Sequence, residues 1–391
     1  MISVNKFLES SWVYSIVIIL IVHLIIRHSL IKILAAFGQE EWYFSVLLSS
    51  VIYGASYLIC TYSFVRMFPR IKAYYKITWI IIFCLTFINE IRFFLQAENY
   101  NLYESIFYGQ FFTNIKISFG VLLIGVWDSI RSKNKSLSIL NLVESLTLIN
   151  CLIVVCAFLL NIEVFESYFQ SERWGYSGVL PRGYSVILPS IFLISRLKEA
   201  KKNYWVTSLY FTCLILSGTK AGLFSVLLII LFVLLSSIQK KISFLVVLFF
   251  VLISINFWLP YFIVYSPFWA NVYSEGGAMG LITSFRSDSL NLFYNSILSD
   301  YDLADWMIGG NIRFEEFRVE ILPVSVFMYF GFLGLLSLLY FVYKMKLSWI
   351  SAIPIIVAIG SGSLLAFPVG LFVWAIWTKE FRLNYTKNII E

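Results

Sequence analysis

The sequence has few charged side chains. Only 13% of its 391 residues are Asp, Glu, Lys or Arg, whereas 60% are hydrophobic. A soluble domain carries about 25% charged and roughly 45–50% apolar residues. So few charges do not suit a water-exposed surface, and long runs without charge fill most of the chain. The composition predicts an all-α, polytopic membrane protein, and we expect residues 1–391 to form a single integral membrane domain.

Cysteine and histidine are also scarce, and neither is placed for chemistry. All five cysteines fall within apolar runs, which is typical of small buried residues rather than of disulfides or metal ligands. The two histidines, His23 and His28, belong to the N-terminal part of the chain. We therefore expect no metal site, and no histidine base near the outer loops of the second half of the chain.

Apolar runs that are long enough, or nearly long enough, to cross a bilayer recur along the chain, since a transmembrane helix needs about 20 such residues. They cover residues 11–27, 42–64, 77–96, 105–127, 137–160, 184–195, 204–217, 222–238, 242–265 and 322–343. The last apolar stretch, 347–377, is too long for one span and contains Pro354 and Pro368. We expect two short or broken spans there, which gives a transmembrane helix bundle of about twelve spans.

Lysine and arginine are divided unevenly between the connections. The basic connections follow every second span, near residues 66–76, 131–135, 196–202, 240–241, 344–346 and 379–387. The positive-inside rule places these connections and both termini in the cytoplasm. Short basic clusters between spans explain the net charge of +7 without a nucleic-acid partner. Arg27 and Lys32 then fall on the outer side, against the rule.

Two polar segments are expected on the outer, periplasmic or extracellular face. The large outer loop, residues 266–317, mixes arginines and carboxylates with aromatic residues and glycines. A loop of about fifty residues is usually functional, so we expect the chemistry there. Pro323 fits the first turn of the next span, which puts Glu320 at the outer mouth of that helix. The smaller outer loop covers residues 161–183.

Cations on the outer face need a local reason, because they oppose the topology rule. Arg173 and Arg182 lie in the smaller outer loop, and Lys220 lies in the turn SGTKAG at 217–222. They are either solvated or snorkelling charges, or they contact an anion. A helix that opens at Gly222 would favour the anion, because a helix N-terminus attracts negative charge.

Three charged residues fall inside predicted spans: Glu90, Arg92 and Lys116. Such charges are costly in hydrocarbon, so we expect them to face the bundle interior or a wet cavity. Glu90 and Lys116 lie at similar depth on consecutive spans and could form an ion pair, either structural or functional.

Five short motifs follow one another between residues 160 and 345. They are RWGYSGVLPR at 173–182, SGTKAG at 217–222, TSFR at 283–286, WMIGG at 306–310 and GFLGLL at 331–336. In this order the chain resembles the bacterial O-antigen polymerase (Wzy) and O-antigen ligase family. The resemblance implies a glycosyltransferase without a cofactor, in the bacterial cytoplasmic (inner) membrane, with its active site facing outward. Such an enzyme joins undecaprenyl-pyrophosphate-linked oligosaccharide repeat units into O-antigen or capsular polysaccharide.

The resemblance also implies roles for individual residues. Arg286 matches the arginine that opens the family's large loop, and Glu320 falls near the position where ligases carry a histidine. That departure favours the polymerase, with Arg286 and Glu320 as catalytic residues. The expected binding residues for pyrophosphate and sugar are Arg173, Arg182, Lys220, Arg313, Arg318, Glu316 and Trp306.

Two alternatives remain open at this stage. An O-antigen ligase would hand the polymer to a lipid-A core. A flippase or transporter of lipid-linked oligosaccharide also suits about twelve spans, although transport sites lie at mid-membrane depth rather than in long outer loops. The expected partners of a polymerase are the lipid-linked oligosaccharide, membrane lipid, and a chain-length regulator and a flippase of the same pathway.

Overall fold

The fold is helical. The computed structural model describes residues 2–36, 43–96, 110–130, 133–167, 174–198, 203–236, 267–283, 291, 293–310, 322–347, 349–361 and 368–390. Within these ranges the only extended pairing is an isolated bridge between Glu166 and Tyr176. The expected all-α class is therefore confirmed for the part of the chain that is described.

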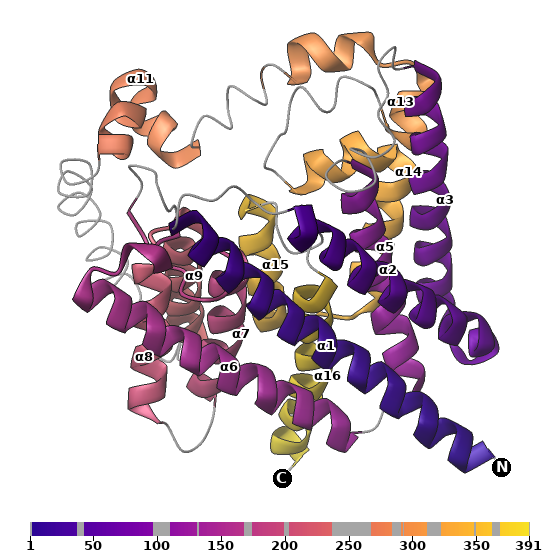
Figure 1. The fold of residues 1–391 in the computed structure, drawn as a ribbon, viewed down its shortest axis with the longest axis horizontal. Coiled ribbons are helices and arrows are strands. Elements are labelled where there is room, and N and C mark those ends of the chain that lie inside the picture. The colour runs from indigo at the N-terminus through magenta and orange to yellow at the C-terminus, as the bar shows by residue number, and fades with distance from the viewer. Residues whose placement is uncertain are drawn as a thin grey trace. The chain divides into compact units, whose positions relative to one another are not determined.

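Most helices follow the predicted apolar runs, whereas α11 and α13 lie within the segment 266–317 that was predicted as a loop; Figure 1 shows their arrangement. The helices are α1 (Ile2–Ala36), α2 (Tyr43–Arg66), α3 (Ala73–Gln96), α5 (Gln110–Ile130), α6 (Lys133–Leu160), α7 (Tyr184–Lys198), α8 (Tyr204–Leu216), α9 (Lys220–Ser236), α11 (Pro267–Thr283), α13 (Leu303–Ile308), α14 (Leu322–Lys344), α15 (Trp349–Ser361) and α16 (Pro368–Ile390). The last apolar stretch, predicted as two short or broken spans, contains the two helices α15 and α16; that they cross a membrane stays a prediction. Pro323 lies in the first turn of α14, also as predicted, where a missing N–H costs nothing.

Among the described residues, five helices are long and apolar enough to cross a membrane, by length and composition. The candidate spans are Ser11–Lys32, Leu48–Arg66, Ala73–Leu95, Lys135–Leu160 and Pro323–Lys344. Their outward surfaces are apolar: Ile91, Phe94 and Leu95 of α3, for example, are all exposed. The total of about twelve spans stays a prediction, because α7, α8 and α9 contribute only shorter apolar helices and the run 242–265 lies outside the described residues.

The chain divides into two compact units. Unit 1 contains residues 1–146 and 293–391, and unit 2 contains residues 147–292. Unit 1 is built around α3, which packs against α14 and α5. The Thr78 hydroxyl donates to the Ser337 carbonyl over 3.1 Å, and Asn89 donates to the Tyr329 carbonyl. Because the later α3 residue meets the earlier α14 residue, these two helices run antiparallel.

The direction of α5 and α16 follows from similar contacts within unit 1. The Phe87 and Phe111 rings lie 5.5 Å apart, which brings the start of α5 to the end of α3. At the other end, Lys72 and Lys379 both form ion pairs with Asp128, and the Tyr75 hydroxyl donates to the Met345 sulfur. The basic ends of these helices therefore meet at one end of unit 1, which we call the basic end. That it faces the cytoplasm stays a prediction.

Candidate functional site

In unit 2, the smaller outer loop packs on the turn between α8 and α9. The Tyr176 N–H donates to the Leu216 carbonyl over 2.8 Å, and the Ser167 hydroxyl donates to the Ser217 carbonyl over 3.0 Å. Gly175 and Gly218 have φ angles of 144° and 62°, and a Cβ on either would overlap the backbone of the other segment. The motifs at 173–182 and 217–222 are thus in direct backbone contact, which only glycine permits at these two positions.

Asn150 fixes the path of the smaller outer loop. Its amide nitrogen donates to the Ser177 carbonyl over 3.1 Å, and its amide oxygen accepts from the N–H groups of Val179 and Leu180 at 2.8 and 3.1 Å. Asn150 is fully buried, so these bonds are formed away from solvent. The sequence did contain a signal for this role, because a buried asparagine within an apolar span requires polar partners.

The α8–α9 turn corrects one expectation. Helix α9 begins at Lys220 rather than at Gly222, and the Gly222 N–H donates to the Thr219 hydroxyl over 3.0 Å. We expected the Gly222 N–H to face an anion, but the Thr219 side chain accepts its hydrogen bond instead. Lys220, in the first turn of the helix, is partly buried. Arg182 is exposed just before α7, where its carbonyl accepts a bond from the Ser185 hydroxyl.

In unit 1, the WMIGG segment packs against a bend in α14. Gly331 has a φ of 58° inside that helix, and a Cβ there would overlap the backbone of Met307 and Ile308. Gly309 and Gly310 have φ angles of 70° and 76°, and the Gly310 N–H donates to the Met328 carbonyl over 2.9 Å. The motifs at 306–310 and 331–336 are therefore also in backbone contact, again through glycines in left-handed conformations.

Two polar residues of α3 hold this segment. The Arg92 guanidinium donates to the Asp305 carboxylate over 2.8 Å and to the Gly309 carbonyl over 2.6 Å. Asn89 donates to the Ile308 carbonyl over 3.0 Å. Asp305 also closes a capping box with Asp302 at the start of α13. The side chain of Arg92 is only 15% exposed and turns toward α13, as expected for a charge within a span.

Aromatic side chains complete the α13–α14 contact. The Trp306 ring stacks on Phe332 with centroids 5.7 Å apart, and the Phe327 and Tyr301 rings lie 5.4 and 6.1 Å away. Burial, together with the Asp305 carboxylate, raises the pKa of Tyr301 well above its usual value, so its hydroxyl stays protonated. Because one face of Trp306 is covered by Phe332, the predicted sugar contact of Trp306 is confined to its remaining surface.

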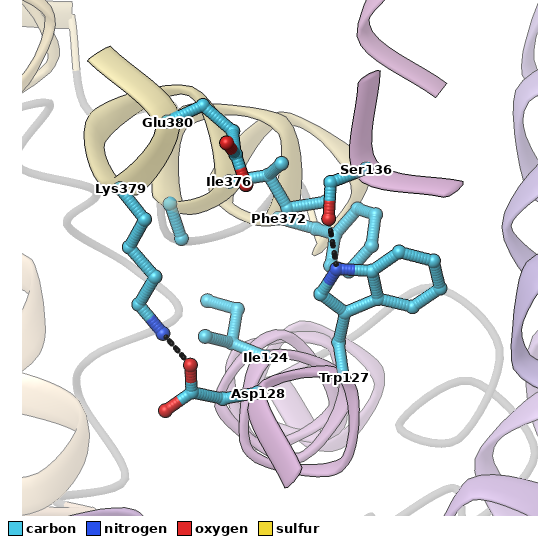
Figure 2. A pocket seen from close by; sticks show the side chains of 9 residues that line it. Ile124, Trp127, Asp128, Ser136, Phe372, Ile376, Lys379 and Glu380 are labelled. Atoms are coloured by element: carbon cyan, nitrogen blue, oxygen red, sulfur yellow. Dashed lines mark hydrogen bonds and ion pairs between the residues drawn. The ribbon is translucent and has the colours of Figure 1, made fainter. Parts of the chain in front are cut away.

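A second charged cluster lies at the basic end of unit 1 (Figure 2). Asp128 of α5 is 2.6 Å from the Lys379 ammonium of α16 and 2.8 Å from that of Lys72. Burial raises the pKa of Asp128, but the two lysines outweigh that effect, so the pKa lies below its usual value. The small pocket beside it is lined by Trp127, Phe372 and other residues of α5 and α16, together with Ser136 of α6. This cluster ties α16 to α5 and thereby stabilises the unit.

Several expected site residues lie outside the described residues. They are Arg173, Arg286, Arg313, Glu316, Arg318 and Glu320. Their roles, and a direct pair between Glu90 and Lys116, stay predictions. The structure does describe residues close to two of them, because residue 174 directly follows Arg173 and α14 begins two residues after Glu320.

The chain matches no protein family model, no curated protein and no solved structure. Support for a function therefore comes from the chemistry of the motifs and from the contacts between them.

Proposed function

We propose that this protein is a membrane glycosyltransferase that polymerises oligosaccharide repeat units carried on undecaprenyl pyrophosphate. The product is O-antigen or capsular polysaccharide, formed at the outer face of the bacterial inner membrane. The observation that carries the proposal is the pairwise packing of four motifs. The segment from residue 174 lies on Ser217 and Gly218, and residues 307–310 lie on α14 at Met328 and Gly331. The two motifs of each pair are far apart in the sequence and meet at glycines that a larger residue could not replace. Motifs that matched the family pattern by chance would not be expected to pack together in this way.

The proposed chemistry suits the charged residues that the motifs and the large outer loop contain. The hydroxyl oxygen of one lipid-linked unit attacks the anomeric carbon of the sugar on another carrier. The bond from that carbon to the phosphate oxygen breaks, and its electron pair leaves with the undecaprenyl pyrophosphate. The hydroxyl proton passes to a carboxylate, for which Glu320 is the candidate. Arg286 and Lys220 would stabilise the negative charge that grows on the pyrophosphate.

The helical framework supports a lipid-linked substrate rather than a soluble one. In the part of the chain that the structure describes, five helices have the length and composition of membrane spans. A carrier with a long isoprenoid tail needs such a bundle, with its pyrophosphate at the headgroup level. The predicted outer loops contain cations, although the positive-inside rule disfavours them there. These cations then have a function as phosphate contacts, and an arginine can pair with two phosphate oxygens at once.

The decisive experiment compares surface polysaccharide in a deletion strain complemented with wild type or with Arg286→Ala. Arg286→Ala should collapse the ladder of chain lengths to one repeat unit at unchanged protein level, and Arg286→Lys should restore it only in part. A normal ladder in Arg286→Ala would remove this residue from the site. Deletion itself separates the alternatives: polymer lost from the lipid-A core would mean a ligase, and the absence of exported units would mean a flippase.

Glu320→Gln tests the proposed base. The amide keeps the shape of the side chain but cannot accept the proton, so the rate of polymerisation should fall while the protein level is unchanged. Glu320→Ala serves as the comparison, because it removes both the proton acceptor and the hydrogen-bonding group. Normal polymerisation in Glu320→Gln would show that Glu320 is not the base.

A further inference from the structure

Helix α13 has an inverted distribution of polar and apolar side chains. Leu303 and Met307, four residues apart on one face, are 80% and 41% exposed, and Ala304 beside them is exposed as well. The carboxylate of Asp305 points inward to Arg92 of α3 and is only 6% exposed. A helix on a water-exposed surface has the opposite pattern, with its charged residues outward. The exposed face of α13 therefore suits an apolar medium.

This face continues into the exposed face of α14. The Trp306 ring stacks on Phe332 with centroids 5.7 Å apart, so the two helices share one side of unit 1. Phe332 is 40% exposed, and Leu336, about one turn further along α14, is 59% exposed. Because Pro323–Lys344 has the length and composition of a membrane span, its exposed apolar side chains are those that lipid would cover.

The depth of α13 can be counted from the other end of α14. The Lys344 ammonium lies 5.5 Å from the ring centroids of both Tyr340 and Tyr343, and aromatic and basic residues of this kind mark a membrane interface. Gly331 precedes Lys344 by 13 residues, which is about 20 Å along a helix. The hydrocarbon core is about 30 Å thick. The Met307 backbone, which a Cβ on Gly331 would overlap, then lies about 10 Å below the opposite interface.

The chain around α13 descends along α14 and returns. Before the helix, the Tyr301 ring lies 6.1 Å from the Phe327 ring. The end of α13 reaches Gly331, about 6 Å further along α14. After the helix, the Gly310 N–H donates to the Met328 carbonyl over 2.9 Å. The segment thus enters and leaves on the same side, which is the path of a re-entrant segment.

Side chains of α3 satisfy the backbone of this segment, and Figure 1 shows α13 beside the end of that helix. The last carbonyls of any helix lack partners within it. The Ile308 carbonyl accepts from Asn89 over 3.0 Å, and the Gly309 carbonyl accepts from Arg92 over 2.6 Å. Irregular backbone at membrane depth is tolerated only where protein groups pair it. This requirement gives a reason for two polar residues near the end of an apolar span.

We propose that α13 is a re-entrant helix and that its face of Leu303, Ala304 and Met307 lies among the acyl chains of the bilayer. Part of the segment predicted as an outer loop is then immersed in the membrane. Lipid is the occupant because the face continues the apolar surface of α14 and lies at the depth of the hydrocarbon core. The proposal depends on α3 and α14 crossing the membrane, and not on the reaction proposed above.

Spin labels on single cysteines test this proposal in the full-length, otherwise cysteine-free protein in phosphatidylcholine nanodiscs. Labels at Leu303→Cys and Met307→Cys should collide more with oxygen, which concentrates in the bilayer, than with a water-soluble nickel chelate. Leu336→Cys is the lipid control. Arg70→Cys, at an exposed position in the connection between α2 and α3, is the water control. A nickel-dominated ratio like that of Arg70→Cys at either test position would overturn the proposal.

Two other outcomes would also overturn it. Weak collision with both reagents at Leu303 and Met307 would mean that protein covers the face, such as a second copy of this chain. A nickel-dominated ratio at Leu336 would mean that α14 does not cross the bilayer there, and the counted depth of α13 would then be wrong.

Thermal unfolding in the same nanodiscs gives an independent readout. Met307→Asp should lower the melting temperature, because a charge placed in hydrocarbon is costly. Met307→Leu is the matched control and should leave it unchanged, since leucine is as apolar and of similar size. On a water-exposed surface Met307→Asp would be nearly neutral. A melting temperature of Met307→Asp equal to that of Met307→Leu would therefore contradict the immersion of this face.

Discussion

Removing the Arg92 side chain should weaken the attachment of the WMIGG segment to α3. Arg92→Ala deletes the bonds to the Asp305 carboxylate and the Gly309 carbonyl, at 2.8 and 2.6 Å. It also leaves the Asp305 carboxylate, 6% exposed, without its cationic partner. Both partners are largely buried, so screening by solvent is weak. Helix α13 remains attached through Asn89 and the Gly310–Met328 hydrogen bond.

Breaking a buried ion pair by removing one partner costs about 3–5 kcal/mol. We take the lower end, about 3 kcal/mol, because Arg92 is 15% exposed and Asp305 keeps its bond from the Asp302 N–H. In a local opening, about 3 kcal/mol corresponds to roughly a hundredfold faster exchange of the protected amides.

Hydrogen exchange of the Gly310 amide, followed by mass spectrometry in nanodiscs, measures this effect. Exchange in Arg92→Ala within about threefold of wild type would refute the reasoning, because the bonds would then contribute less than about 1 kcal/mol. In a double-mutant cycle with Asp305→Ala, the two changes together should cost less than the sum of the single changes.

Asp302→Asn is the matched control. Asp302 is also near Arg92, but its carboxylate is 3.9 Å from the guanidinium and the side chain is 64% exposed. Its main contact is the bond that it accepts from the Asp305 N–H, and asparagine caps a helix equally well. The exchange rate of the Gly310 amide should therefore change by no more than about fivefold, since exposed ion pairs contribute at most about 1 kcal/mol.

Three further predictions concern stability and topology. Gly331→Ala should destabilise unit 1 by at least about 2 kcal/mol in thermal unfolding, because φ at Gly331 is 58° and a Cβ would overlap Met307. Gly54→Ala is the control: a Cβ at Gly54 would have no atom within 4 Å, so stability should change by less than about 1 kcal/mol. Asp128→Asn should lower the melting temperature at pH 7. Since the pKa of Asp128 is lowered in the folded state, its contribution is full above the ordinary value of 3.8, and the two proteins should converge only as the pH falls below that value. In a cysteine-free background, a cysteine at Ser289 should react with an impermeant maleimide from outside and one at Ser132 should not; the reverse would overturn the orientation.

The sequence by itself determined the class of the protein and the location of its helices. The length of an apolar run is a local property, and in a bilayer it requires a helix because every backbone group must be paired internally. The runs at 42–64, 77–96 and 322–343 therefore predicted α2, α3 and α14 closely. Proline acts locally too, so Pro323 marked the first turn of α14.

Only the tertiary structure decided which motifs meet and what holds them. No local pattern pairs Gly175 with Gly218, or Gly331 with residues 307–308, because each contact joins segments far apart in the chain. Helix α9 begins at Lys220 because the Thr219 hydroxyl accepts the hydrogen bond of the Gly222 N–H, which the hydrophobic pattern does not reveal. Arg92 was recognisable as a costly charge within a span, but its partner Asp305 is 213 residues away. Periodicity and composition describe single helices, whereas side-chain pairing depends on how the helices pack against one another.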